Sequence, residues 1–153
     1  MRKLIALLLL CLATLGVDAQ IYKIYKIQVG FQQSAQGLFT CDNMTSHYSH
    51  VIIESSPTRS MTMSLYNDKT KAKAYVYHLS DPLTTQSNQI HYDAMRISPH
   101  GSRWSDITIT TLGNKATIRL ENASDMWGGK IFYIYSAKIQ KNTKGLENFL
   151  YDN

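Results

Sequence analysis

The densest group of side chains that could do chemistry lies in the stretch PHGSRWSD, residues 99–106. A serine hydrolase needs a nucleophile, a base and an orienting carboxylate. The stretch contains all three types, as His100, Ser102, Ser105 and Asp106. Triad members normally converge from distant parts of a chain, however, and no Gly-x-Ser-x-Gly elbow occurs in this sequence to expose a nucleophile. The stretch therefore indicates a turn before a strand, and we assign no catalytic residue.

Metal chemistry has little support in the spacing of the ligand types. His47 and His50 lie three residues apart, but their segment predicts a loop entering a strand, and no Cys-x-x-Cys or His-Glu-x-x-His motif accompanies them. Pairs of Asn and Asp in predicted loops offer oxygen ligands for Ca²⁺, yet the same residues are ordinary in turns. These pairs are Asp42 with Asn43, Asn67 with Asp68, and Asn122 with Asp125. We assign no metal and no cofactor.

Aromatic side chains are the most prominent feature, with ten Tyr, four Phe and two Trp. A Tyr ring gives a large contact surface with a polar tip, so it suits both core packing and recognition of a protein or a sugar ring. We expect packing to explain most of them. The residues expected to contact a partner, if one sheet face is a recognition face, are Trp104, Trp127, Tyr133 and Tyr135.

Trp127 lies in ENASDMWGGK, residues 121–130, where the local sequence is typical of a turn. Asn and Asp side chains make local hydrogen bonds in turns, and the paired glycines tolerate positive φ. A strand corner covered by Trp127 explains every residue of this segment. Its use as a ligand platform is the alternative.

Residues 1–19 predict a cleaved secretory signal peptide. Arg2 and Lys3 supply the positive start, an apolar run follows, and Val17-Asp18-Ala19 places small residues at a cleavage site. A membrane-spanning helix needs about 20 apolar residues, and this run is shorter. We therefore expect no transmembrane segment. The sequence therefore predicts a secreted, extracellular protein.

An extracellular location gives meaning to two Asn-x-Ser/Thr sequons, at Asn43 and Asn122, which predict N-glycosylation. Cys41 is the only cysteine outside the predicted signal peptide, so an intramolecular disulfide is not expected. A buried thiol is one expectation for Cys41. The other is an intermolecular disulfide that makes a homodimer.

The charge distribution gives little direction. The chain has a formal net charge of +5, and its lysines are spread along the sequence. Nucleic-acid binders usually concentrate basic residues into one patch or helix face. Lys69, Lys71 and Lys73 are instead spaced by two residues, which places them on the same side of the chain where a strand begins. We therefore expect a solvated face and no nucleic-acid partner.

The elements that must position these residues are predicted by period-2 alternation of apolar and polar side chains, the signal of half-buried strands. In KATIRLE, for example, Ala116, Ile118 and Leu120 share one face. Gly113-Asn114 predicts a hairpin loop. Strands are expected over residues 21–29, 37–41, 50–54, 61–66, 74–79, 89–97, 106–110, 115–121 and 130–139. This spacing predicts an all-β protein: a single antiparallel β-sandwich, immunoglobulin-like or jelly-roll-like, of roughly eight to nine strands. It covers residues 20–140, followed by a polar C-terminal tail, residues 141–153.

Two stretches resemble known families. ATIRLENASDMWGGKIFYIY, residues 116–135, resembles the strand–loop–strand of an immunoglobulin domain with its Asp-x-Gly-x-Tyr corner, which implies a sandwich. No second cysteine follows on the later strand, and no Trp follows Cys41 at about the immunoglobulin spacing. GLFTC followed by MTMSLYND is similar to the opening of secreted transthyretin-like proteins, with a longer gap. No residue role is carried over from either resemblance.

These patterns predict a secreted, glycosylated binding protein that recognises an extracellular protein or glycan, with a role in defence or host interaction, and not an enzyme. One alternative is a secreted hydrolase whose site is assembled from loops, with His78, His100 and Asp106 as its residues. The other is an extracellular structural protein that self-associates through a sheet edge and a Cys41 disulfide.

Overall fold

The computed structural model describes residues 21–34, 47–56, 59–99, 101–122, 131–142 and 146. Within these residues all regular secondary structure is β-strand, and every pairing is antiparallel. The strands are β1 (Ile21–Ser34), β2 (Tyr48–Ser56), β3 (Arg59–Asn67), β4 (Lys73–Leu79), β5 (Leu83–Gln86), β6 (Gln89–Ser98), β7 (Gly101–Leu112), β8 (Lys115–Asn122) and β9 (Ile131–Gln140).

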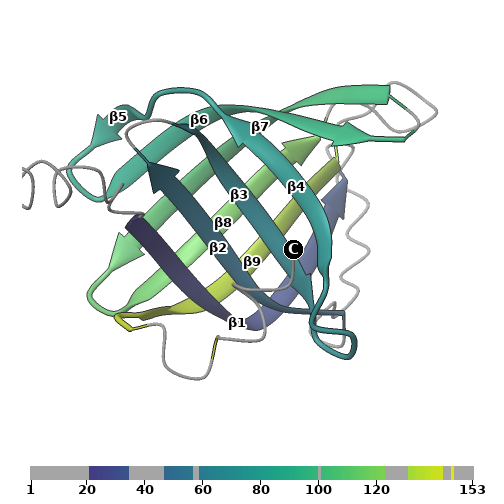
Figure 1. Ribbon diagram of the computed structural model, residues 1–153. Coiled ribbons are helices and arrows are strands. Elements are labelled where there is room, and N and C mark those ends of the chain that lie inside the picture. The colour runs from purple at the N-terminus through teal and green to yellow at the C-terminus, as the bar shows by residue number, and fades with distance from the viewer. Residues whose placement is uncertain are drawn as a thin grey trace, which may run out of the picture.

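Eight of these strands close into a barrel (Figure 1). The sheet runs in the order β4-β3-β2-β1-β9-β8-β7-β6-β5, and an additional pairing joins β4 to β6. β5 pairs only with β6 in the described part and lies outside the ring. The predicted all-β antiparallel class is confirmed. The predicted sandwich is wrong, because the β4–β6 pairing joins the two ends of one sheet where a sandwich would stack two separate sheets.

The barrel interior is filled by the side chains that alternation assigned to one face. Inward-facing and outward-facing residues alternate along the strands of a barrel, and about eight strands leave an interior that side chains can fill. Met63 and Leu65 of β3 are buried in this way, as are Ile118 and Leu120 of β8. The buried interior cluster consists of Tyr25, Ile27, Val51, Ile53, Met63, Leu65, Tyr77, Leu79, Tyr92, Ala94, Ile107, Ile109, Ala116, Ile118, Leu120, Tyr135 and Ala137.

A second apolar cluster covers part of the outside of the barrel. Ile24, Ile52 and Tyr66, on three neighbouring strands, pack with Leu146, which is 2% exposed. Leu146 belongs to the segment predicted as a polar tail. Its side chain packs on the outer face of β1, β2 and β3.

Most predicted strands coincide with observed ones. The strand predicted at residues 37–41 lies outside the described residues, and β5 was not predicted. The predicted hairpin is confirmed, since Leu112 of β7 pairs with Lys115 of β8 around Gly113 and Asn114. Gly113 has a φ of 60° and Asn114 has no positive φ, the pattern of a II′ turn.

One end of the barrel, here called the pocket end, is where β1, β3, β6 and β8 finish and β2, β4, β7 and β9 begin. Residues 1–19, Cys41, Asn43, His100 and Trp127, which carry several predictions, lie outside the described residues. No helix with the length and apolarity to cross a membrane is found in the described ranges.

Candidate functional site

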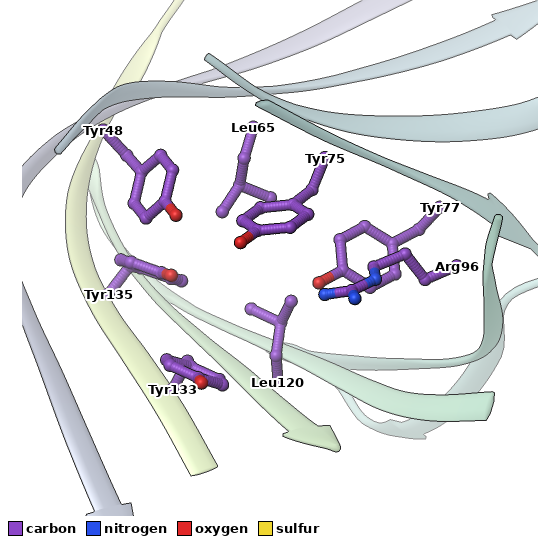
Figure 2. A pocket seen from close by; sticks show the side chains of 8 residues that line it. All are labelled: Tyr48, Leu65, Tyr75, Tyr77, Arg96, Leu120, Tyr133 and Tyr135. Carbon is purple, nitrogen blue, oxygen red and sulfur yellow. The ribbon is translucent and has the colours of Figure 1, made fainter. Parts of the chain in front are cut away.

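A cavity of about 70 Å³ lies inside the barrel at the pocket end. This volume has room for a few water molecules or a small ligand group. Figure 2 shows five tyrosine rings around it, with one guanidinium reaching in beside Tyr77. The lining residues are Tyr48, Leu65, Tyr75, Tyr77, Arg96, Leu120, Tyr133 and Tyr135.

A β-bulge turns Tyr48 into the barrel. On β2, Val51 and Ile53 point inward, so strict alternation would point Tyr48 outward. The β2–β3 register shifts between Tyr48 and His50, which inserts Ser49 as an extra residue. Bulges re-aim side chains in this manner and are frequent at the rims of barrels and next to functional sites.

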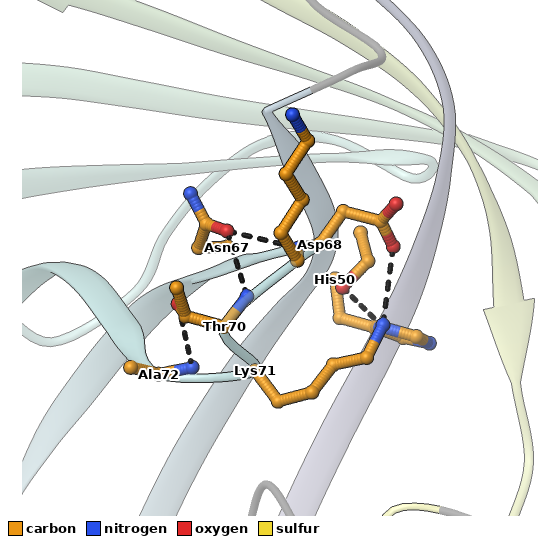
Figure 3. A network of polar contacts seen from close by, with 8 residues as sticks. His50, Asn67, Asp68, Thr70, Lys71 and Ala72 are labelled. Carbon is orange, nitrogen blue, oxygen red and sulfur yellow. Dashed lines mark hydrogen bonds and ion pairs between the residues drawn. The ribbon is translucent and has the colours of Figure 1, made fainter.

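Tyr75 and Tyr77 lie on β4, which follows the turn between β3 and β4. Figure 3 shows the polar contacts of this turn. The Oδ1 atom of Asn67 accepts hydrogen bonds from the backbone N–H groups of Lys69 at 2.9 Å and Thr70 at 3.0 Å. The backbone N–H of Asn67 also donates to the carbonyl of Ala72 at 2.9 Å. An Asn side chain that bonds to following backbone groups stabilises a turn, so Asn67 sets where β4 begins.

Regular alternation on β9 places Tyr133 and Tyr135 inward, and aromatic contacts hold the rings together. The ring centroids of Tyr48 and Tyr75 are 6.0 Å apart, and those of Tyr48 and Tyr135 are 6.2 Å apart with the rings edge to face. Edge-to-face and offset pairs at such distances are favourable. The cavity therefore has a preformed aromatic wall.

Burial keeps the tyrosine hydroxyls of this wall protonated. Burial raises the pKa of Tyr77 to about 12, although the neighbouring Arg96 guanidinium acts in the opposite direction. Burial also raises the pKa values of Tyr48, Tyr133 and Tyr135, and nearby tyrosines add to the effect. These hydroxyls are neutral donors and acceptors at physiological pH.

Arg96 supplies a positive charge to this aromatic setting. Its Cζ atom lies 4.7 Å from the centroid of the Tyr75 ring, within cation–π range. Its Nε atom is buried and has no hydrogen-bond partner. A buried donor without a partner is uncommon and calls for an explanation, because its desolvation is not compensated.

Arg103 lies directly opposite Arg96 in the β6–β7 register. Both arginines border a cleft of about 410 Å³, which shares Tyr75 and Arg96 with the smaller cavity. Like charges directly opposite each other on neighbouring strands are destabilising. The cleft is lined by Ala74, Tyr75, Val76, Arg96, Ser98, Pro99 and Arg103.

The cleft has a structural cause in the barrel closure. β4 and β6 pair only through Tyr77 with Arg96, His78 with Met95, and Leu79 with Ala94. Nearer the pocket end the two strands do not pair within the described residues, and the cleft lies between the start of β4 and the β6–β7 hairpin. The cleft therefore lies beside the short closing seam and next to the cavity.

No carboxylate neutralises the two arginines in the described part of the chain. The ion pairs found there are Lys71 with Asp68, Lys73 with Glu54, His91 with Asp93 and Arg119 with Glu121. Neutral tyrosines line the cavity, and the guanidinium groups of Arg96 and Arg103 border the adjoining cleft. The two together are suited to a ligand group that carries negative charge.

The residues predicted to contact a partner do not form one group. Tyr133 and Tyr135 both line the cavity, and Tyr135 is 2% exposed, so a ligand reaches it only from within. Trp104 is 67% exposed and lies opposite Met95 on β6, away from the cavity lining. Asn122 ends β8 at the pocket end. The binding roles of these residues and the glycosylation of Asn122 stay predictions.

Of the three residues of the alternative hydrolase, His78 and Asp106 lie among the described residues, and His100 lies outside them. His78 pairs with Thr62 and Met95, and neither His78 nor Asp106 lines the cavity. Asp106 lies opposite Asp93, and the ligand atoms of His91, Asp93 and Asp106 lie within 4.8 Å of one another on the barrel surface. Sequence reasoning did not join these three residues, because only the register of β6 with β7 brings Asp106 next to His91 and Asp93.

Sequence reasoning missed Tyr48, Arg96 and Arg103. Arg96 carried a usable signal, because it is in phase with Tyr92 and Ala94, the buried residues of β6. A charged residue on the apolar face of a strand indicates either a buried partner or a ligand. Tyr48 carried no such signal, since the bulge that places it has no mark in the sequence.

Fold and site together describe an eight-stranded antiparallel barrel with an aromatic and cationic pocket at one end. No protein-family model and no curated protein sequence matches the chain. Its fold is similar to transferrin binding protein B from serogroup B Neisseria meningitidis, at 10% identity and a TM-score of 0.46, over 78% of this chain and 25% of that one. A mutant of transferrin binding protein B from Haemophilus parasuis gives 10% identity and a TM-score of 0.45, over 82% and 27%. The chain thus spans about a quarter of the length of these structures.

Proposed function

We propose that this chain is a secreted extracellular binding protein that holds a protein or glycan partner at the pocket end of its barrel. The observation that carries the proposal is the convergence of five tyrosines and Arg96, from four strands, on one preformed cavity. Pockets with mostly aromatic walls and a few placed polar groups are typical ligand sites.

The chemistry of the lining favours recognition. Tyrosine rings stack on flat ligand faces, their hydroxyls donate and accept hydrogen bonds, and guanidinium groups bind anions in a fork geometry. Tyr133 and Tyr135 are the predicted contact residues that share this lining. Tyr75, at 37% exposure, is the wall residue that an approaching partner can reach from solvent.

The remaining features of the proposal come from the sequence. Secretion after removal of residues 1–19, N-glycosylation at Asn43 and Asn122, and a role in defence or host interaction are its extracellular context. Cys41 either stays a thiol or links two copies. Mass spectrometry of secreted protein, with and without an N-glycosidase and a reductant, tests all of these except the biological role.

The decisive experiment probes arrays of glycans and extracellular proteins with the secreted protein. Capture of a partner by the wild type is expected to fall at least about tenfold with Tyr75→Ala, which removes an accessible wall ring. Phe132→Ala is the matched control, because it removes an aromatic ring that stacks with Arg119 on the outward side of β9, and it should leave capture unchanged. Trp104→Ala tests the predicted contact residue that lies away from the cavity.

Two results would overturn the proposal. Loss of capture with Trp104→Ala and not with Tyr75→Ala would move the binding surface to the outside of β7. An absence of capture, together with turnover of a generic ester or glycoside, would replace binding by the loop-assembled hydrolase.

A further inference from the structure

We infer that the pocket takes an acidic sugar: a pyranose ring that carries a carboxylate, with Arg96 and Arg103 binding the carboxylate and the tyrosine wall contacting the ring. This inference rests on the proposed binding function and names the ligand chemistry for the same site. Three observations carry it.

The first observation is the arginine pair. Arg96 and Arg103 are register partners on β6 and β7, and both border the same cleft. Opposite residues have Cβ atoms about 5 Å apart, so two guanidinium groups at such positions repel each other without an anion between them. A carboxylate between them accepts hydrogen bonds from both forks and removes the repulsion.

The second observation is the unpartnered donor. The Nε atom of Arg96 is buried beside the Tyr75 and Tyr77 rings and has no hydrogen-bond partner. Arg96 is an ion-pair partner of no carboxylate in the described part of the protein. A ligand oxygen at this position satisfies the donor that the folded chain leaves open.

The third observation is size and wall chemistry. The cleft of about 410 Å³ falls within the range of about 300 to 1,000 Å³ of small-ligand sites. It shares the lining residues Tyr75 and Arg96 with the cavity of about 70 Å³. A single sugar ring fits the cleft, and tyrosine rings offer its C–H face a flat apolar surface while their hydroxyls meet its hydroxyls. The positive charge then selects a sugar with a carboxylate over a neutral one.

The test is an NMR titration of ¹⁵N-labelled protein with two sugars that differ at one group. Methyl β-D-glucuronide carries a carboxylate where methyl β-D-glucoside carries a hydroxymethyl group. The glucuronide is expected to shift the amides of Tyr75, Arg96 and Arg103 with a Kd of roughly 1 mM, and the glucoside to bind at least about tenfold more weakly.

Variants assign the effect to the pocket. Arg96→Met should weaken glucuronide binding at least about tenfold, and Arg96→Lys should recover part of it, because Lys keeps the charge and loses the fork. Arg119→Met is the matched control. It removes an arginine from the exposed face of β8, where Arg119 stacks on Phe132 at 4.1 Å, and should bind as the wild type does.

The outcomes separate this inference from the function on which it rests. Equal binding of glucoside and glucuronide would overturn the carboxylate and leave the binding function standing. Inorganic sulfate that binds as tightly as the glucuronide, with no effect of the glucoside, would reduce the site to a simple oxyanion site and overturn the sugar. Absence of pocket shifts with either sugar, while the array still captures a partner through Tyr75, would overturn the ligand and retain the function.

Discussion

At the scale of single residues, Arg96 combines a position that is unfavourable for folding with the proposed role in ligand binding. Its guanidinium lies on the inward face of β6, in phase with Tyr92 and Ala94, which are fully buried. Moving a charged group towards an apolar interior is unfavourable unless the group is paired. A buried donor in a pocket that the folded chain leaves without a partner is a candidate for ligand binding.

The first prediction is that Arg96→Met leaves the free energy of unfolding unchanged or raises it by up to about 1 kcal/mol. Met fills similar volume, and relief from the unsatisfied Nε donor offsets the lost cation–π contact with Tyr75. Urea unfolding of wild type and variant measures the difference. A loss of more than about 2 kcal/mol would show that Arg96 is a structural residue and would weaken its assignment to a ligand.

His50 gives a second prediction, on acid stability. It is 8% exposed on β2, and burial, followed by the charges of Lys26 and Lys71, lowers its pKa to about 4, with Asp68 acting the other way. The unfolded chain has its ordinary pKa near 6.5, so on acidification the unfolded state takes up the proton first. Stability therefore falls as pH drops from about 6.5 to about 4.

The expected loss assigned to His50 is on the order of 2 kcal/mol across that window. Unfolding free energies of wild type and His50→Gln at pH 7, 5.5 and 4 measure it, because the variant lacks this titration and should show a flatter profile. Parallel pH profiles for the two proteins would contradict the assignment. Ser49, whose Oγ lies 3.0 Å from His50 Nδ1, is unchanged in both.

At the scale of elements, the strands could be predicted because each presents alternating side chains to a packed interior and to solvent. Residues 61–66 and 115–121 alternate cleanly and became β3 and β8. β5 could not be predicted in this way, because Leu83–Gln86 is four residues long and contains only one apolar side chain. It forms because it can add to the edge of β6, a tertiary effect.

The site was predictable only in part, for a related reason. Tyr133 and Tyr135 follow the β9 alternation and could be placed together from the sequence. Tyr48 reaches the same cavity through the bulge at Ser49, and a bulge depends on the register of the neighbouring strand. Arg103 could not be assigned to the site from the sequence, because only the pairing of β6 with β7 places it opposite Arg96.

The third prediction compares two turns at opposite ends of the barrel. Asn67→Ala removes the two side-chain hydrogen bonds of the β3–β4 turn, and Gly113→Ala puts a Cβ on a residue with a φ of 60°. Each should lower the free energy of unfolding by about 1 kcal/mol. Asn67→Ala alone should also weaken ligand binding, because this turn sets the position of Tyr75.

Gly113→Ala serves as the control for general loss of stability in that comparison. Space around the added Cβ is open, so backbone strain is the only expected effect. Thermal unfolding and the sugar titration on both variants provide the measurement. Equal weakening of binding by the two changes would mean that the pocket responds to overall stability and not to the turn.

At the scale of the whole molecule, the step from sandwich to barrel lay beyond the sequence pattern. The same inward residues, such as Ile107 and Ile118, would be buried between two stacked sheets or inside one closed sheet. The difference is the pairing of β4 with β6, which is three residues long. The sequence of neither strand indicates that β4 and β6 pair with each other. Alternation therefore predicts the strands but not the closure of the sheet into a barrel.

The shortness of that pairing leads to the fourth prediction, on native-state hydrogen exchange. Amides of Tyr77–Leu79 and of residues 94–96 that bond across the β4–β6 seam should open at a free energy about 1 to 2 kcal/mol below that of the β8–β9 amides, because short pairings separate locally before the barrel unfolds. An acidic sugar that contacts Tyr75 on β4 and Arg96 on β6 bridges the seam and should slow this exchange in proportion to its occupancy.

The control for this ligand effect is Arg96→Met, in which the seam amides should exchange at the same rates whether or not the sugar is present. Uniform protection around the whole ring would contradict this prediction, because it would mean that the barrel opens only by global unfolding.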